Sequence, residues 1–417
     1  MSPDLPFDII AIIIDIVGED KDTYLLKELS LVSHCFYEIC SKHLFAIVDL
    51  HGGSFWRRSR QASSKKGFVK LLINKPDVLK YIRKLKYNVE YYDDESDDLL
   101  SLIILNFLPT FSCLHSLTIT TSSRKWNKVN PSLTSALLYL MHLPTINHLH
   151  LSHIRNFPLS SLTQSVNLLR LDIQSLLSRI RPREEDASPE IVVEMMPKIR
   201  EFDTLWSSRL TTKLLYAKTQ DGRPAFNFMD LRRFSTRIAE FEDEQNIRYL
   251  LQKAKLLEKL ELSVDRGQNL VGLLSSNERT LKVLDLWVSL WDGTSIYLGG
   301  ICEELEALAG HNMLEAFKLC VRMGSGDSIF TEGSIGSTLQ KVENLLVKPG
   351  WSALRRVSFK VAILRRNRNA EKLCDALQSL PDKYLNHLSK LESVTFSYQA
   401  YLSCCPKCHF ESPSVGC

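Results

Sequence analysis

The sequence of 417 residues contains no uninterrupted apolar run that approaches about eighteen residues, the length of a candidate membrane-spanning helix. It also lacks a secretory start, because Asp4, Asp8 and Asp15 stand in place of a basic segment followed by a small-residue cleavage site. We therefore expect a soluble, intracellular protein of the cytoplasm or the nucleus, with no membrane partner.

Strong net charge and a disulfide framework are missing as well. A net charge of +4 is too small to predict nucleic-acid binding on its own, so a nucleic-acid partner is not expected. Ten cysteines spread over 417 residues do not form the pattern of a small secreted domain, and a reducing compartment fits them better. The hydrophobic share of 44% and the charged share of 24% are those of an ordinary globular protein.

Residues 5–50 carry more apolar side chains than three short helices can bury. A first helix is expected to start at Pro6 and Asp8, since proline suits a first helical turn and an acidic residue suits a helix N-terminus. Its predicted buried stripe consists of Ile9, Ile12, Ile13, Ile16 and Val17, with a second apolar line at Ile10 and Ile14. One of these faces can pack in a core, and the other needs a partner.

Several motifs in this stretch follow one another in a recognisable order. They are Leu5-Pro6, the isoleucine-rich helix, Leu29-Ser30-Leu31-Val32-Ser33 followed by Phe36, and Leu44-Phe45. Together they resemble an F-box, the three-helix module by which substrate receptors bind a Skp-type adaptor of cullin-RING ubiquitin ligases. The resemblance implies an adaptor-binding surface at Leu5, Pro6, Ile9, Ile13, Leu26, Val32 and Ser33. It departs from the family at Phe45-Ala46, where many relatives have a tryptophan. The alternative is an ordinary helical subdomain packed against the rest of the chain.

From residue 81 onward one phrase recurs: an apolar residue, a second one three positions later, and usually a third after two more. The clear copies are Ile82/Leu85/Tyr87, Leu114/Leu117/Ile119, Ile146/Leu149/Leu151, Leu168/Leu171/Ile173, Leu257/Leu260/Leu262, Leu281/Leu284/Leu286, Leu314/Phe317/Leu319, Leu354/Val357/Phe359 and Leu391/Val394/Phe396, with weaker copies at Ile199/Phe202 and Leu231/Phe234. This spacing is typical of a chain that leaves a turn and enters a short strand. Amphipathic helices are predicted between copies at 132–141, 241–257, 301–308 and 370–380.

These observations predict an α/β protein in which a three-helix F-box-like module precedes an irregular, leucine-rich-repeat-like solenoid. The combination resembles fungal F-box proteins with degenerate C-terminal repeats. The predicted domains are the adaptor-binding module at 1–50, a linker at 51–80, the solenoid at 81–400 and a disordered, cysteine-rich tail at 401–417. Two departures from the repeat family stand out. No asparagine ladder is present, and the copies start between 22 residues (146 to 168) and 40 residues (314 to 354) apart, against about 20 to 29 in the family.

The tail contains the one candidate metal site. Its possible ligands are Cys404, Cys405, Cys408, His409 and Cys417, and the two-residue gap between Cys405 and Cys408 lets both sulfurs reach one zinc ion. The second half of a pair of such motifs is missing, so no metal and no cofactor are expected. The acidic run at 93–98 is predicted to be a solvated loop. Histidines lie singly in the sequence, so no catalytic constellation is predicted.

The sequence thus predicts a non-catalytic substrate-recognition subunit of a cullin-RING (SCF-type) ubiquitin ligase, which binds a Skp-type adaptor and an unidentified protein target. Two alternatives stay open. One is an F-box scaffold protein without a ubiquitin-ligase role. The other is a metal-dependent nucleic-acid-binding protein that uses the cysteine tail and the basic residues between 51 and 67.

Overall fold

A computed structural model describes residues 6–50, 65–89, 95–121, 125–174, 196–204, 208–219, 222–265, 270–290, 300–323, 332–364 and 370–403. The chain forms two compact units. The first comprises Met1–Lys198 and Ala217–Phe226, and the second comprises Ile199–Tyr216 and Asn227–Cys417. Within the described residues, no helix is both long and apolar enough to cross a membrane.

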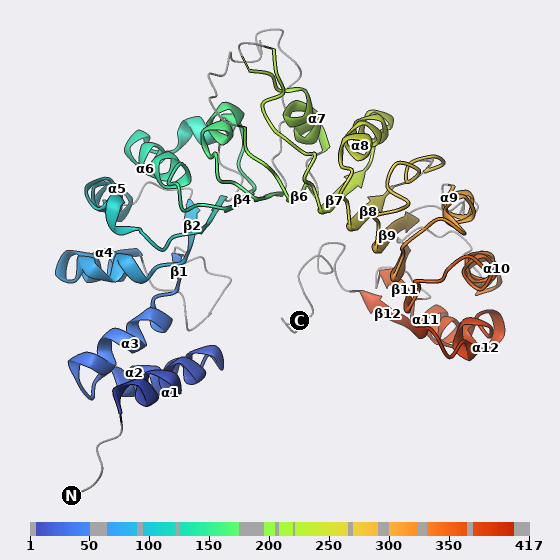
Figure 1. The fold of residues 1–417 in the computed structure, drawn as a ribbon, viewed down its shortest axis with the longest axis horizontal. Coiled ribbons are helices and arrows are strands. Elements are labelled where there is room, and N and C mark those ends of the chain that lie inside the picture. The colour runs from blue at the N-terminus through green and yellow to red at the C-terminus, as the bar shows by residue number, and fades with distance from the viewer. Residues whose placement is uncertain are drawn as a thin grey trace, which may run out of the picture. The chain divides into compact units, whose positions relative to one another are not determined.

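The first unit begins with helices and continues as alternating helices and strands. Its elements are α1 (Phe7–Glu19), α2 (Thr23–Ser30), α3 (His34–Leu44), β1 (Ile47–Leu50), α4 (Lys65–Asn74), the 3-10 helix η1 (Pro76–Tyr81), β2 (Lys84–Val89), α5 (Glu95–Asn106), η2 (Leu108–Thr110), β3 (Ser116–Thr121), η3 (Trp126–Lys128), α6 (Pro131–Met141), β4 (His148–Ser152), η4 (Leu159–Gln164) and β5 (Arg170–Gln174). The strands are parallel neighbours in chain order, and the helices cover one face of them (Figure 1).

The second unit repeats this alternation. Its elements are β6 (Glu201–Asp203), α7 (Ser208–Tyr216), β7 (Arg233–Ile238), α8 (Phe241–Lys253), β8 (Lys259–Val264), β9 (Val283–Leu290), α9 (Ile301–Leu308), β10 (Ala316–Met323), α10 (Glu332–Leu346), β11 (Arg356–Leu364), α11 (Ala370–Gln378), α12 (Leu380–Tyr384), η5 (Leu388–Lys390) and β12 (Thr395–Ser403). Every pairing among β6–β12 is again parallel and in chain order.

The predicted fold class was wrong. The structure is an all-parallel α/β fold in which β1 to β5 of the first unit and β6 to β12 of the second pair in chain order, not a three-helix module followed by a leucine-rich-repeat-like solenoid. The sheet begins inside the segment assigned to the helical module, because β1 pairs in parallel with β2. Helices α4 and η1 occupy the described part of the predicted linker. The strand signal of β1 is only four residues long and follows α3 almost directly, so the helical pattern before it concealed it.

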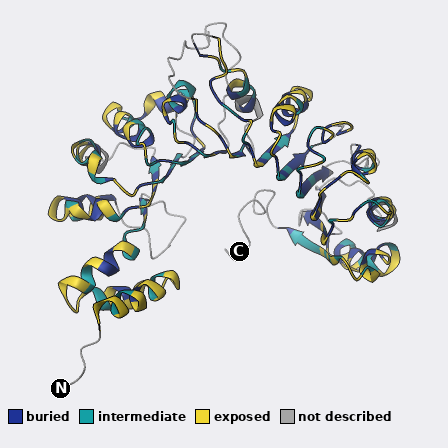
Figure 2. Ribbon diagram, viewed as in Figure 1, coloured by how far each residue is buried: buried dark blue, intermediate teal, exposed yellow. Residues whose placement is uncertain are grey.

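Alternation along the strands explains where the core lies. In β2, Leu85, Tyr87 and Val89 are buried while Lys84 and Lys86 are exposed, as expected for a strand with one face against a helical layer. Figure 2 shows the same division along the chain, with buried strands and helices whose outer sides are exposed. The apolar phrase therefore supplies the core-facing residues of each strand.

The phrase also predicts the strand register, with one exception. Its second apolar residues pair directly in successive strands of each unit: Leu85, Leu117, Leu149 and Leu171 in the first, and Phe202, Phe234, Leu260, Leu284, Phe317 and Val357 in the second. In β12, however, Phe396 and not Val394 pairs with Val357. Both Leu391 and Val394 donate their backbone N–H to a carbonyl three residues earlier, so the last copy contains an additional turn.

The predicted helices are confirmed as α6, α8, α9 and α11, and the acidic loop is corrected in part. Residues 95–98 form the first turn of α5, where carboxylates are favoured by the partial positive charge of a helix N-terminus. Residues 93 and 94 lie outside the described residues. The run of like charge concealed this helix, because its composition is equally typical of a solvated loop.

A buried carboxylate in the second unit anchors the chain that leads to β12. Glu343 of α10 has no solvent exposure, and its Oε1 accepts hydrogen bonds from the backbone N–H groups of His387 and Leu388 at 2.8 and 2.9 Å. These two backbone donors lie just before and within η5, outside any strand, so their hydrogen bonds are not made to a neighbouring strand. The Glu343 carboxylate therefore serves as the hydrogen-bond acceptor that a neighbouring strand provides elsewhere in the sheet.

We expect Glu343→Ala to lower the free energy of unfolding by about 2 to 4 kcal/mol, because it leaves the buried N–H of Leu388 and the part-buried N–H of His387 without their acceptor. Glu392→Ala is the matched control, since Glu392 is exposed in the same unit, and its effect should stay within about 0.5 kcal/mol. Urea unfolding followed by circular dichroism measures both. Equal stability of the two variants would contradict the anchoring role.

Candidate functional site

The three N-terminal helices enclose a small apolar core. Its buried members are Ile14 of α1, Leu26 of α2, and Ile39 and Cys40 of α3. Partly buried apolar residues pack around them: Ile10, Ala11, Val17, Leu29, Phe36 and Leu44. The stripe of α1 that faces this core is thus the line of Ile10 and Ile14, continued by Val17.

A helix cap and a contact between a histidine and an aspartate stabilise the arrangement of these three helices. Asp22 accepts a hydrogen bond from the backbone N–H of Leu25 at 3.0 Å and so caps α2. The Nε2 atom of His43 on α3 lies 2.7 Å from Asp15 Oδ1 on α1. The His43 ring lies against Gly18, where a side chain would collide with it. Glycine at this position therefore allows α3 to approach α1.

A second set of apolar residues on these helices is exposed to solvent. On α1 the exposed fractions are 51% for Phe7, 44% for Ile9, 58% for Ile12, 47% for Ile13 and 54% for Ile16. The four isoleucines follow a spacing of three and four residues, so they line one side of the helix. The stripe expected to be buried thus points away from the helical core, so of the two faces of α1 it is the one left for a partner.

Further apolar side chains are exposed on α2 and in the turn before α3. Tyr24 is 73% exposed, Leu25 39%, Leu31 80% and Val32 65%. Together with Phe7 and the four outward isoleucines of α1, they make up what we call the N-terminal apolar surface. Scattered exposed apolar residues are common in proteins, but nine within one small helical segment are a feature of binding surfaces.

The residues predicted to bind an adaptor divide into three groups. Ile9, Ile13 and Val32 belong to the N-terminal apolar surface, and Pro6 is exposed at the N-cap of α1. Ser33 is also exposed, and its hydroxyl caps α3 by accepting from the backbone N–H of Phe36 at 3.4 Å. Leu26 is only 2% exposed and belongs to the helical core. Leu5 lies outside the described residues.

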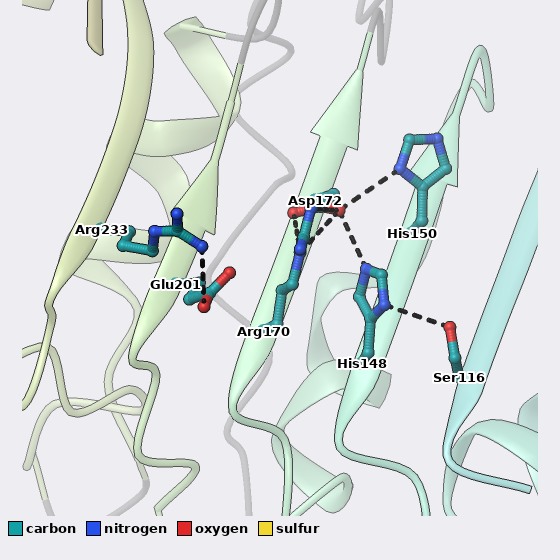
Figure 3. Close-up of polar contacts among 7 residues, drawn as sticks. All are labelled: Ser116, His148, His150, Arg170, Asp172, Glu201 and Arg233. Atoms are coloured by element: carbon teal, nitrogen blue, oxygen red, sulfur yellow. Dashed lines mark hydrogen bonds and ion pairs between the residues drawn. The ribbon is translucent and has the colours of Figure 1, made fainter. Parts of the chain in front are cut away.

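A polar cluster spans three neighbouring strands of the first unit (Figure 3). Ser116 of β3, His148 of β4 and Arg170 of β5 pair in register, and Asp172 follows two residues after Arg170. His148 Nε2 lies 2.9 Å from Asp172 Oδ2, and its Nδ1 lies 3.1 Å from Ser116 Oγ. Because a carboxylate only accepts, Nε2 donates to Asp172, and in the neutral ring Nδ1 accepts from the serine hydroxyl.

The Asp172 carboxylate is shared by further donors. Arg170 Nε lies 3.1 Å from each of its oxygens, and His150 Nδ1 lies 3.7 Å from Oδ2. Burial alone would raise the pKa of Asp172. The hydrogen bonds from His148, His150 and Arg170, with the charge of Arg170, outweigh burial and hold that pKa well below its usual range. Asp172 is therefore ionised at neutral pH.

Serine, histidine and aspartate in this order are also the components of a hydrolase triad. A nucleophilic serine must be reached by its substrate, and Ser116 is only 5% exposed. Its histidine is in turn committed to a carboxylate that a guanidinium also binds. The arrangement accordingly cross-links β3, β4 and β5, and it keeps a buried charge compensated.

Sequence reasoning missed this cluster because it treated the histidines singly. The repeated phrase held the necessary signal, since Ser116, His148 and Arg170 each stand two residues after the first apolar residue of a copy. Figure 3 also shows Glu201 and Arg233, which occupy the same register position in β6 and β7 of the second unit, 3.4 Å apart.

The described part of the chain contains no group of histidine, cysteine, aspartate and glutamate residues placed to hold a metal ion. All candidate zinc ligands of the tail, from Cys404 to Cys417, lie outside it. No family model matches the sequence, and no curated protein matches it either.

We expect Asp172→Asn to lower the free energy of unfolding by about 2 kcal/mol at neutral pH, because it removes the charge that several donors share. A depressed pKa contributes stability above the unfolded pKa of about 3.9, and that contribution is lost as the pH falls. The gap between variant and unmodified protein should therefore narrow below about pH 4. Urea unfolding at a series of pH values measures it. Asp77→Asn, an exposed site in the same unit, is the control, and a pH-independent gap would contradict the assignment.

Proposed function

We propose that this protein is the substrate-recognition subunit of a cullin-RING (SCF-type) ubiquitin ligase, that its N-terminal helices are an F-box, and that they bind a Skp-type adaptor. The observation that carries this proposal is the N-terminal apolar surface. Its isoleucines on α1 are between 44% and 58% exposed, although the helix already presents a separate stripe to its own core.

The free energy gained by burying these exposed side chains supports a role in binding another protein. Complete burial of an isoleucine contributes about 1.5 to 3 kcal/mol relative to exposure, so burying the remaining half contributes about 1 kcal/mol per residue. Four outward isoleucines with Phe7, Leu31 and Val32 can then contribute several kcal/mol to an interface. That is enough for a few of these residues to dominate binding, as hot spots in interfaces do.

The competing interpretation is that these helices form an ordinary subdomain packed against the rest of the chain. In that case the outward isoleucines of α1 would be covered by other elements. Among the residues that the structure describes, Ile9, Ile12, Ile13 and Ile16 remain exposed. The exposure favours a surface that is completed by another protein.

In the proposed mechanism the chain performs no chemistry itself. The N-terminal apolar surface attaches it to the adaptor, and another part of the chain holds a protein target. Both bound partners then belong to one assembly, so that transfer of ubiquitin becomes effectively intramolecular. The rate gain comes from effective concentration, and the catalytic groups belong to other proteins of the ligase.

We expect the double substitution Ile9→Asp with Ile13→Asp to weaken binding to a purified Skp-type adaptor by about 100-fold or more. The substitutions remove the free energy of burying two isoleucines, and the two introduced carboxylates resist desolvation in an apolar interface. Isothermal titration calorimetry with the full chain measures the affinity. Because both positions are exposed, the stability of the variant should change by less than about 0.5 kcal/mol.

Ile73→Asp is the matched control, since Ile73 of α4 is 64% exposed in the same unit but lies outside the N-terminal apolar surface. Its affinity for the adaptor should equal that of the unmodified chain. Adaptor binding that survives the double substitution, or that is absent from the unmodified protein, would sink the proposal. Co-purification of a cullin with the unmodified chain, and its loss with the double variant, would extend the result from the adaptor to the ligase.

A further inference from the structure

All charged residues of β7–β12 lie on one face of the sheet, opposite the helices. The pairing of the strands places them there at alternate positions. They are the seven basic residues Arg233, Arg237, Lys259, Lys318, Arg322, Arg356 and Lys360 and the two acidic residues Glu261 and Asp285. The composition of this face is thus strongly basic, although the whole chain carries a net charge of only +4.

The two acidic residues lie low on this face. Glu261 and Asp285 pair in register, and their side chains are 23% and 12% exposed. Burial raises the pKa of both carboxyl groups, and the charge of Asp285 adds to the effect on Glu261. The ammonium groups of Lys259 and Lys318 lie 3.8 and 3.7 Å from Glu261 and Asp285, respectively. Each carboxylate therefore lies beside a lysine that is more exposed than itself.

Three cations protrude around a pair of serine hydroxyls. Arg356 and Lys360 are exposed on β11 on either side of Ser358, and Lys318 of β10, 51% exposed, pairs with Ser358 in register. Ser397 of β12 donates from its hydroxyl to Ser358 Oγ at 2.9 Å. We call these five residues the cationic face.

Several basic residues on this side of the sheet lie near acidic ones, and Lys318 is one of them, 3.7 Å from Asp285. Arg233 lies 3.4 Å from Glu201 of β6, and Arg237 forms an ion pair with Asp265. Arg356 and Lys360 are two further exposed cations on β11, and neither β10 nor β11 contains an acidic residue. A local excess of this kind attracts anionic partners and raises their association rate.

We propose that the cationic face binds an extended, acidic segment of a protein target. Its carboxylates would contact Lys318, Arg356 and Lys360, with the serine hydroxyls available as additional donors. The inference rests on the proposed function, because that function requires a protein target, and it names the chemistry of the segment that is recognised.

The spacing of the cations favours a peptide over nucleic acid. Side chains on one side of an extended peptide recur about every 6.6 to 6.8 Å, which is also the spacing from Arg356 to Ser358 to Lys360 along a strand. A protein that makes about 6 to 10 phosphate contacts uses more cations than the three of the cationic face. A short acidic segment matches both the number and the spacing of the charges.

The test measures fluorescence anisotropy of a labelled peptide of alternating glutamate and serine, titrated with the full-length protein at low and at physiological salt. The variant carries Lys318→Glu, Arg356→Glu and Lys360→Glu together. The control carries Lys341→Glu, Lys348→Glu and Lys372→Glu, three exposed residues on α10, the turn after it and α11, with the same change in net charge. We expect the variant to weaken binding by about tenfold or more and the control to weaken it far less.

Equal weakening by both variants would overturn the proposal, because net charge and not the cationic face would then explain binding. So would stronger binding of single-stranded DNA with the same dependence on the three cations, which would assign the face to nucleic acid. Absence of peptide binding to the unmodified protein would overturn it too. Adaptor affinity of the triple variant is measured in parallel and should be unchanged, so that failure here is distinguished from failure of the proposed function.

Discussion

The parallel register of the strands is the constraint on which the other features depend. In each unit it places equivalent residues of successive copies side by side, while alternation along a strand sends neighbours to opposite faces. Leu85, Leu117 and Leu149 therefore form a continuous apolar row against the helices. The same register brings Ser116, His148 and Arg170 together on the other face. A shift of one residue would exchange the two faces and expose the core.

The N-terminal helices follow a different rule. Their core is small, since Ile14, Leu26, Ile39 and Cys40 are its only buried apolar members among the described residues. A helix with apolar side chains on two sides can satisfy one side within such a small bundle. The isoleucines on the other side then remain exposed until another surface covers them. An interface thus completes burial that the three helices cannot achieve by themselves.

The sequence was sufficient to predict most strands and their register, because the apolar phrase records both the turn and the alternation. It did not indicate that a strand follows the three N-terminal helices, so the pairing of β1 with β2 was missed. It also could not decide which isoleucine stripe of α1 faces inward, because isoleucines occur at helical spacing in both. Contact with Leu26 and Ile39 decides that choice, and such contacts depend on how α1 packs against α2 and α3. The Asp172 cluster was not predicted for a related reason. Its members are distant in sequence and become neighbours only when their strands pair.

Side-chain length explains why the polar face of the second unit presents more positive charge than its sequence suggests. Aspartate and glutamate are short, so their carboxylates stay close to the sheet, and the surrounding side chains shield them, as for Glu261 and Asp285. Lysine and arginine extend their apolar stems over such neighbours and place the charged ends in water. Where acidic and basic residues lie on adjacent strands, the carboxylates are thus less exposed to solvent than the charged ends of the basic side chains, as for Asp285 and Lys318. A partner that approaches Lys318, Arg356 and Lys360 therefore meets positive charge first, while the less exposed carboxylates of Glu261 and Asp285 lie beside Lys259 and Lys318.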